Sequence, residues 1–150
     1  PQDWHPRYQN SVKTYEYRIL NREMPDPLRR KYTWHVSFPL DLDKMRAAAE
    51  YLKGEHDFRS FCSVHTGAKT TVRTVCTLDI EKTGDEIIIR ISGNGFLYNM
   101  VRIIAGTLTE VGRGLRTPEN VKKILEAEER EKSGATAPPQ GLTLISIEYK

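Results

Sequence analysis

The sequence predicts an α+β domain, with helices packed on one face of an antiparallel sheet. Three segments alternate apolar and polar residues with the period of a β-strand, at residues 14–21, 76–81 and 86–92. Two segments repeat apolar residues with helical spacing, at residues 41–52 and 99–111. The 150-residue chain contains no internal repeat and no low-complexity tract, so we expect a single domain over residues 1–150.

The first third of the chain predicts two strands and a helix. Residues 14–21 form a strand with three residues on one face, namely Tyr15, Tyr17 and Ile19. Residues 31–38 predict a second strand, which Pro39 closes. Asp41 is a capping residue for a helix that Gly54 ends. The apolar stripe of this helix consists of Leu42, Met45, Ala48, Ala49 and Leu52.

A central β-hairpin is predicted next. Cys76, Leu78 and Ile80 alternate with polar residues, which is the pattern of a half-buried strand. A Thr-Gly-Asp turn at residues 83–85 leads into a second strand at residues 86–92. The apolar face of that strand consists of Ile87, Ile89 and Ile91.

Two further helices and a last strand complete the predicted fold. One helix begins near Asn99 and ends at Gly112 and Gly114. The other opens with Thr-Pro-Glu at residues 117–119, which supplies a capping hydroxyl, a proline at the first helical position and an acid at the positive end. The remaining segments are predicted to be a solvated helix end, a loop rich in small residues and proline, and a strand, at residues 128–132, 133–141 and 142–149.

Composition excludes several classes of protein. No apolar run approaches the roughly 20 residues that span a bilayer, and no signal peptide is visible. Cys62 and Cys76 have no CxxC spacing, which favours reduced thiols in a cytoplasmic protein. The chain begins at Pro1 rather than methionine, so we expect that an upstream segment exists.

Charge is distributed unevenly along the chain, although the net charge is only +3. Residues 59–75 hold Arg59, Lys69 and Arg73 and no acid, and residues 1–31 hold seven Lys or Arg against four acids. The acids gather instead at residues 119–131. This asymmetry is consistent with one face for a polyanion, and equally with ordinary surface charge.

The most informative segment is Gly-Asn-Gly-Phe-Leu-Tyr-Asn-Met-Val-Arg at residues 93–102. It joins a predicted buried strand to a predicted buried helix, and its arginine falls in the first turns of that apolar helix. An arginine in such a place is costly unless a carboxylate or phosphate meets it. Sequence spacing identifies no acid of this chain as the partner, so we expect the partner of Arg102 to lie outside the chain.

This segment resembles the hallmark segment of the TruA family of tRNA pseudouridine synthases. Four other segments match the same family in the same order, so the resemblance covers most of the chain. They are Trp-His-Pro-Arg-Tyr at residues 4–8 with Lys-Thr-Tyr-Glu-Tyr-Arg at 13–18, Gly-Glu-His-Asp-Phe-Arg-Ser-Phe at 54–61, Thr-Val-Arg-Thr-Val at 71–75, and Gly-Ala-Thr-Ala-Pro-Pro-Gln-Gly-Leu-Thr-Leu at 134–144.

The sequence also departs from the family pattern in one respect. The Gly-Arg-Thr-Asp segment that carries the family's catalytic aspartate is absent. The chain therefore resembles the C-terminal domain of such an enzyme, which is half of a pseudouridine synthase fold, without the N-terminal domain that bears the aspartate.

The resemblance assigns roles to two residues. Arg102 matches the arginine that pairs with the catalytic aspartate, a task suited to a guanidinium because it stays charged and binds a carboxylate in two places. Without the family, an arginine near a helix start is usually a surface residue. Tyr15 matches the tyrosine whose ring packs on the target base. Alternation places Tyr17 on the same side as Tyr15, and either could instead be a core aromatic, so only the family register selects Tyr15.

Other candidate residues have weaker support. Phe96 and Leu97, with Tyr98, are expected to shape the pocket that holds the substrate base or the core beneath it. Arg7, Arg59, Lys69 and Arg73 are candidates for phosphate contacts, which position RNA without reading its sequence. A cluster of possible ligands, namely His56, Asp57, Cys62 and His65, has no recognised metal spacing, and we predict no metal site.

The resemblance predicts an isomerase that converts uridine to pseudouridine at tRNA positions 38 to 40, in the anticodon stem-loop, without cofactor or metal. The predicted partners are tRNA, the protein's own N-terminal domain and a second copy in a homodimer, with a cytoplasmic location and no membrane contact. Two alternatives are a non-catalytic RNA-binding module and a structural dimerisation domain. Neither alternative needs Arg102 together with Tyr15.

Overall fold

The computed structural model describes residues 11–63 and 70–149 of the 150-residue chain. The strands are β1 (Ser11–Asn21), β2 (Trp34–Val36), β3 (Gly54–Asp57), β4 (Val72–Thr83), β5 (Glu86–Gly93) and β6 (Leu142–Tyr149). The helices are α2 (Leu42–Glu50), α3 (Met100–Gly112) and α4 (Pro118–Ala127). Short 3-10 helices lie at Arg59–Phe61, Arg130–Lys132 and Pro139–Gly141.

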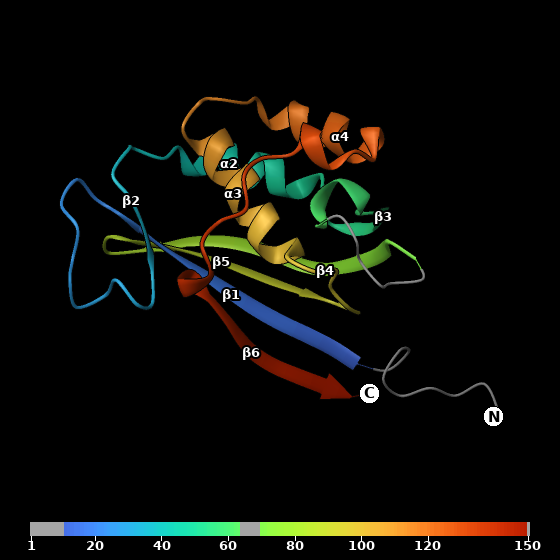
Figure 1. Ribbon diagram of the computed structural model, residues 1–150, viewed down its shortest axis with the longest axis horizontal. Coiled ribbons are helices and arrows are strands. Elements are labelled where there is room, and N and C mark those ends of the chain that lie inside the picture. Colours follow the sequence, from blue (N-terminus) through green and yellow to red (C-terminus); the bar gives the residue numbers. More distant parts are fainter. Residues whose placement is uncertain (1–10, 64–69, 150) are drawn as a thin grey trace.

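The strands form one sheet in the order β2-β1-β5-β4-β3, with β6 also paired to β1 (Figure 1). The predicted α+β class and the β4–β5 hairpin are confirmed. The sheet is mixed rather than wholly antiparallel, because β2 runs parallel to the end of β1 and pairs Ile19 with Trp34. The long strand β1 pairs with β5 on one side, whereas β6 and β2 pair with successive parts of it on the other.

The predicted strand over residues 31–38 is largely wrong. Only Trp34–Val36 is a strand. The residues just before this strand form a turn that is closed by hydrogen bonds to the carbonyl of Arg29. That oxygen accepts hydrogen bonds from the backbone N–H groups of Tyr32 and Thr33, at 3.0 and 3.1 Å, and from the Thr33 hydroxyl at 2.8 Å. A backbone carbonyl satisfied in this way holds the chain in a turn rather than in a ladder.

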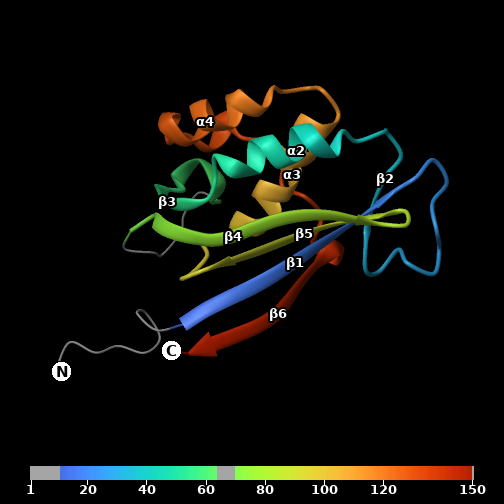
Figure 2. The ribbon, with the colours of Figure 1, turned by 180° about the vertical axis from the view of Figure 1, so that it is seen from behind.

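The helices cover one face of the sheet: α2 and α3 both pack on the sheet, and α4 packs against α2 (Figures 1 and 2). Helix α3 contacts α2, β1 and the 3-10 helix at Arg59–Phe61, and nearly every one of its residues is buried. The covered face of the sheet is apolar and includes Tyr17, Leu78, Ile80, Ile89 and Ile91, each no more than 4% exposed. Burial of this face and of the helix stripes against it supplies the main stabilising free energy of the domain.

The predicted helix starts are confirmed by their capping bonds. The Asp41 carboxylate accepts from the Lys44 N–H at 3.1 Å, and the Thr117 hydroxyl accepts from the Asn120 N–H at 3.2 Å. Gly54 has φ +97°, a conformation that glycine adopts without strain, and it opens β3 directly after the first helix. Strand β3 was absent from the sequence prediction.

The helices do not extend over the outer part of the sheet, where β6 and the first half of β1 project beyond them (Figure 2). In the antiparallel register, Tyr15 pairs with Leu144, Lys13 with Ile147 and Ser11 with Tyr149, so these β6 residues share the helix-facing side of the sheet. Leu144, Ile147 and Tyr149 are 46, 41 and 68% exposed. We call these three residues the bare apolar face.

The helices of the described residues are all too short or too polar to cross a bilayer.

Candidate active site

The turn that joins β5 to α3, residues 94–99, contacts the main candidate residues of the sequence analysis. It begins after Gly93, where a side chain would not fit, because an added Cβ would lie 2.6 Å from the carbonyl oxygen of Thr74. The close approach of β4 and β5 at this point therefore requires glycine. Beyond it, the turn meets Tyr15 through Phe96, approaches Arg73 at Gly95 and meets Arg102 through Asn99.

Tyr15 and Phe96 form an aromatic pair at the outer end of the helix-facing side. Their ring centroids lie 5.1 Å apart at an interplanar angle of 88°, which is the favourable edge-to-face arrangement. Both residues are half-buried, so both keep accessible ring surface. Leu97, by contrast, is 5% exposed and belongs to the hydrophobic core.

Tyr17 lies on the same face of β1 but is fully buried. Its hydroxyl donates to the carbonyl of Pro138 at 2.6 Å, and its ring packs edge-on against Trp34. Burial raises the pKa of the Tyr17 phenol well above its usual value, and the positive charge of Arg102 opposes this rise only in part. Alternation could not separate the two tyrosines, but burial leaves Tyr15 as the one with an accessible ring.

Arg102 lies in the first turn of α3 and is held by two neutral acceptors. Its Nε donates to the carbonyl of Ala137 at 2.8 Å, and its Nη1 donates to Oδ1 of Asn99 at 3.1 Å. No ion pair joins Arg102 to an acid among the described residues. The guanidinium charge is therefore not compensated by an acid within that part of the chain.

Residues 133–138, which we call the strap, run from the helical layer down to the start of β6 (Figure 1). The strap lies against α3 through four backbone groups. The N–H of Gly134 donates to the Thr107 hydroxyl at 2.9 Å and that of Ala135 to Glu110 Oε2 at 3.0 Å. The N–H of Ala137 donates to the carbonyl of Arg102 at 3.0 Å, opposite the bond that Ala137 accepts from Nε. Arg102 is thus fixed to the strap at both its backbone and its side chain.

The candidate phosphate contacts are only partly brought together. Arg73 lies beside the turn, with its Nε 3.5 Å from a Cβ placed on Gly95, and its Nη1 donates to the carbonyls of Thr70 and Val72. Arg59 is exposed and follows β3, which pairs Asp57 with Val72 at the same end of the sheet. Among the described residues, no hydrogen bond or ion pair joins Arg59 to the turn. Arg7 and Lys69 lie outside the described residues.

The cluster of possible metal ligands has other contacts. His56 Nε2 lies 2.7 Å from the carbonyl of Lys53, and Asp57 Oδ1 accepts from the Thr71 hydroxyl at 2.6 Å. Cys62 is buried, and His65 lies outside the described residues. Within the described residues, no three His, Cys, Asp or Glu side chains are grouped as metal ligands.

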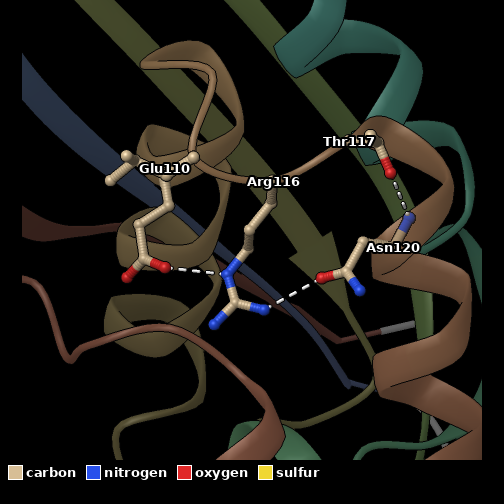
Figure 3. A pocket seen from close by; sticks show the side chains of 5 residues that line it. Glu110, Arg116, Thr117 and Asn120 are labelled. Atoms are coloured by element: carbon tan, nitrogen blue, oxygen red, sulfur yellow. Dashed lines mark hydrogen bonds and ion pairs between the residues drawn. The ribbon is translucent and has the colours of Figure 1, made fainter.

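A hollow of about 400 Å³ lies between the end of α3 and the start of α4 (Figure 3). Arg116 spans it, donating through Nε to Glu110 at 2.7 Å and through Nη1 to Asn120 at 2.9 Å. The charge of Arg116 is paired with Glu110 of α3, and its Nη1 bonds Asn120 of α4. Arg116 therefore has a structural role, because it links the two helices. Glu110 lies more than two turns farther along α3 than Arg102, so the hollow is separate from the site around Arg102.

Two contributors to the site were missed by the sequence analysis, the amide of Asn99 and the carbonyl of Ala137. The first had a usable signal, because Asn99 precedes Arg102 by three residues and residues three apart share a helix face. The second had none, because a backbone carbonyl carries no sequence signature and Ala137 is 35 residues away.

Comparison with known proteins agrees with this arrangement. The tRNA pseudouridine synthase family model matches residues 48–150. The tRNA pseudouridine synthase A of Brevibacillus brevis is 53% identical over 146 residues, which are 97% of this chain and 60% of that protein. The protein of the same name from Halalkalibacterium halodurans is 51% identical over 142 residues, covering 95% of this chain and 54% of that protein.

The Bacillus subtilis protein of that name is 46% identical over 146 residues, covering 97% of this chain and 59% of the relative. The chain thus spans between half and two thirds of the length of these relatives. The family match covers more than half of the chain and includes Phe96, Arg102 and the strap. The chain belongs to the tRNA pseudouridine synthase family.

Proposed function

We propose that this chain is the C-terminal domain of a tRNA pseudouridine synthase and holds both the target base and the catalytic carboxylate in place. The observation that carries the proposal is the geometry of Arg102, whose guanidinium has two neutral acceptors and no acid partner among the described residues. An oriented but uncompensated guanidinium is suited to receive a carboxylate from elsewhere. In this proposal, the carboxylate is the aspartate of the N-terminal domain.

The proposed chemistry requires three groups. The bond between C1′ and N1 of a uridine breaks, the uracil turns, a bond forms between C1′ and C5, and the proton lost from C5 is balanced by a proton gained at N1. An aspartate carries the reaction, a cation holds that aspartate, and a flat ring supports the base after it leaves its stack. Arg102 supplies the cation and Tyr15 supplies the ring, which packs edge-to-face with Phe96 at a centroid distance of 5.1 Å. Neither metal nor cofactor takes part in this scheme.

The substrate in this proposal is a uridine of the tRNA anticodon stem-loop, at positions 38 to 40. Arg73 and Arg59 would contact the RNA backbone at the end of the sheet where the turn lies. Such contacts fix the RNA in register and make its affinity depend on salt. Selection of those positions, assembly as a homodimer and a cytoplasmic location stay predictions.

The bare apolar face supports the presence of the N-terminal domain. Leu144, Ile147 and Tyr149 lie in the same sheet as Tyr15 and are 41 to 68% exposed. Contiguous exposed apolar surface usually marks an interaction site, and the relatives contain a further part that this chain does not cover. We propose that the N-terminal domain packs there and brings its aspartate to Arg102.

The activity test compares the chain alone with the intact protein that carries it. The 150-residue chain should make no pseudouridine in an anticodon stem-loop, because none of its residues matches the family's catalytic aspartate. The intact protein should modify the same RNA. Pseudouridine is measured by mass-sensitive labelling. Turnover by the chain alone would contradict the proposal that the catalytic aspartate belongs to the N-terminal domain.

The two alternatives give different results in the same preparation. An RNA-binding module would bind tRNA but make no pseudouridine even as the intact protein. A structural dimerisation domain would bind tRNA no better than it binds any other polyanion.

If Arg73 contacts a phosphate, Arg73→Ala should reduce the salt dependence of tRNA binding by about one counterion.

Two substitutions of Tyr15 test whether its ring stacks on the uracil. Tyr15→Leu removes the flat face but keeps apolar bulk, and stacking on an aromatic is worth about 1–3 kcal/mol per base. We therefore expect the Leu variant of the intact protein to lose roughly tenfold or more in turnover, with little change in melting temperature. Tyr15→Phe keeps the face, and its rate measures any role of the hydroxyl in removing the C5 proton.

The outcome that would return Tyr15 to a structural role is a parallel loss of rate and melting temperature in both variants. Tyr17→Phe is the matched control for the hydroxyl. Because the Tyr17 hydroxyl is buried and bonded to Pro138, its removal should lower stability.

A further inference from the structure

Asn99 has an unusual backbone conformation for its place in the fold. It precedes α3 with φ 61° and ψ 9°, and Glu128 is the only other non-glycine described residue with positive φ. Asparagine tolerates this left-handed region better than most residues, but a cost remains. A residue held in such a conformation points to a role that compensates for the strain.

The usual role of asparagine at the start of a helix does not explain this position. A capping asparagine accepts a hydrogen bond from an N–H in the first turn. The Asn99 side chain makes no such bond. At the start of α3 a backbone group serves instead, since the N–H of Met100 donates to the carbonyl of Leu97 at 3.0 Å.

The amide of Asn99 bridges two side chains. Its Nδ2 donates to the Ser63 hydroxyl oxygen at 2.9 Å, and its Oδ1 accepts from Nη1 of Arg102 at 3.1 Å. This orientation of the amide is determined by chemistry, because a guanidinium can only donate and must face the oxygen. Ser63 is itself held, since its N–H donates to the carbonyl of Tyr98 at 3.2 Å.

This bridge and the strap hold separate nitrogens of the same guanidinium. Ala137 accepts from Nε and Asn99 accepts from Nη1, whereas Nη2 makes no hydrogen bond to the described residues. Because Nε and Nη1 are both hydrogen-bonded, the plane of the guanidinium is held in one orientation. Because both acceptors are neutral, the group is oriented without losing its attraction for a carboxylate.

We propose that Asn99, fixed by Ser63, is a positioning residue that aims Arg102 at the catalytic carboxylate. This inference rests on the proposed function and deepens it. The amide of Asn99 is engaged by Ser63 and Arg102, and in this proposal it acts by holding Arg102 in the orientation that receives the aspartate. A supporting residue of this kind governs the rate of the chemical step more than the binding of the RNA.

The test uses the intact protein and replaces Asn99 by glycine. Glycine adopts φ 61° freely, so Asn99→Gly keeps the backbone and removes only the amide. We expect kcat for pseudouridine formation to fall about tenfold, while KM for the tRNA changes less than about twofold. The melting temperature should stay the same or rise slightly. Asn99→Ala should show the same kcat as Asn99→Gly. Its melting temperature should be lower than that of Asn99→Gly, because alanine is strained at this φ.

A second variant separates orientation from mere packing. Asn99→Asp keeps the size and shape of the side chain but places a carboxylate against Arg102. That carboxylate should neutralise the guanidinium and compete with the catalytic aspartate. We therefore expect Asn99→Asp to be slower than Asn99→Gly by about a further tenfold, although its stability should be unchanged or higher.

The matched control is Asn94→Gly on the same turn. The Oδ1 of Asn94 accepts from the Thr74 N–H at 3.0 Å and does not contact Arg102, so its loss removes a similar bond without disturbing the guanidinium. Its kcat should stay within about twofold of the parent. Full kcat in Asn99→Gly, or equal rates in Asn99→Asp and the parent, would overturn the inference. An unmutated intact protein that makes no pseudouridine would instead overturn the proposed function.

Discussion

Replacing Arg102 by lysine in the intact protein should slow pseudouridine formation about a hundredfold and change tRNA affinity far less. Lysine keeps the charge but has no planar fork, so it cannot bond Ala137 and Asn99 while also receiving a carboxylate in two places. Losing an oriented ion pair at a catalytic carboxylate costs on the order of 3 kcal/mol in the barrier. Single-turnover rates on an anticodon stem-loop, with binding measured separately, give both quantities.

Arg46→Lys is the matched control for this substitution. Arg46 also donates from Nε to a backbone carbonyl, that of Ile80 at 2.9 Å, but it lies on α2 and outside the candidate site. The loss of one such bond should leave the rate within about twofold. A near-full rate in Arg102→Lys would show that the guanidinium is structural and that the catalytic carboxylate is held by another group.

Gly106→Ala should lower the stability of the domain by about 3 kcal/mol. In an open helix interior this change stabilises by roughly 0.5–1 kcal/mol, so the expected sign is the reverse of the helix propensity. The reason is the strap, since a Cβ at Gly106 would collide with the carbonyl oxygen of Ala135 and lie 3.3 Å from the N–H nitrogen of Ala137. Both are backbone atoms, so the strap itself must move and lose hydrogen bonds to α3.

The melting temperature of the Gly106→Ala protein should fall by about 6–12 °C, the range expected for a domain of this size. Because the strap holds Nε of Arg102, the rate should fall even below the melting transition. Gly112→Ala is the control, because there the added methyl meets the flexible side chain of Met45 at 2.8 Å and can be accommodated more cheaply. A Gly106→Ala protein as stable as the parent would contradict the close packing of the strap.

Local signals in the sequence were sufficient to predict much of the fold. The start of α4 follows from Thr117 and Pro118, which need no tertiary context to cap and begin a helix. Residues 142–149 alternate, and β6 has those bounds. Alternation also predicted the β4–β5 hairpin, because the turn between those strands is short.

The failures occurred where distant contacts decide the structure. Strand β3 has only four residues and consists of Gly-Glu-His-Asp, which carries no strand pattern and is a strand only because β4 pairs with it. The parallel pairing of β2 depends on the route of the preceding loop, which periodicity does not reveal. The sequence also favoured a strand at residues 31–33, where the turn at Arg29 prevails.

The candidate site shows the same division. The absence of an acid at a suitable spacing from Arg102 was visible in the sequence, and the family register singled out Tyr15. The pairing of Tyr15 with Phe96 joins residues 81 positions apart and could not be derived from periodicity. The strap is part of a long loop of small residues that has no periodic pattern. Its contact with Arg102 could therefore be found only from the structure.

The order of the strands also has a consequence for how the domain is made. β1 is the first described strand and β6 the last, yet the two are neighbours, so their pairing joins segments about 130 residues apart. Contacts of such long sequence separation form late, and this one cannot form until nearly the whole chain has left the ribosome. The carbonyl that holds Arg102 belongs to the same late segment. We therefore expect a nascent chain that stops before residue 137 to expose one edge of β1. Such a chain would also lack the Ala137 carbonyl that accepts the hydrogen bond from Arg102.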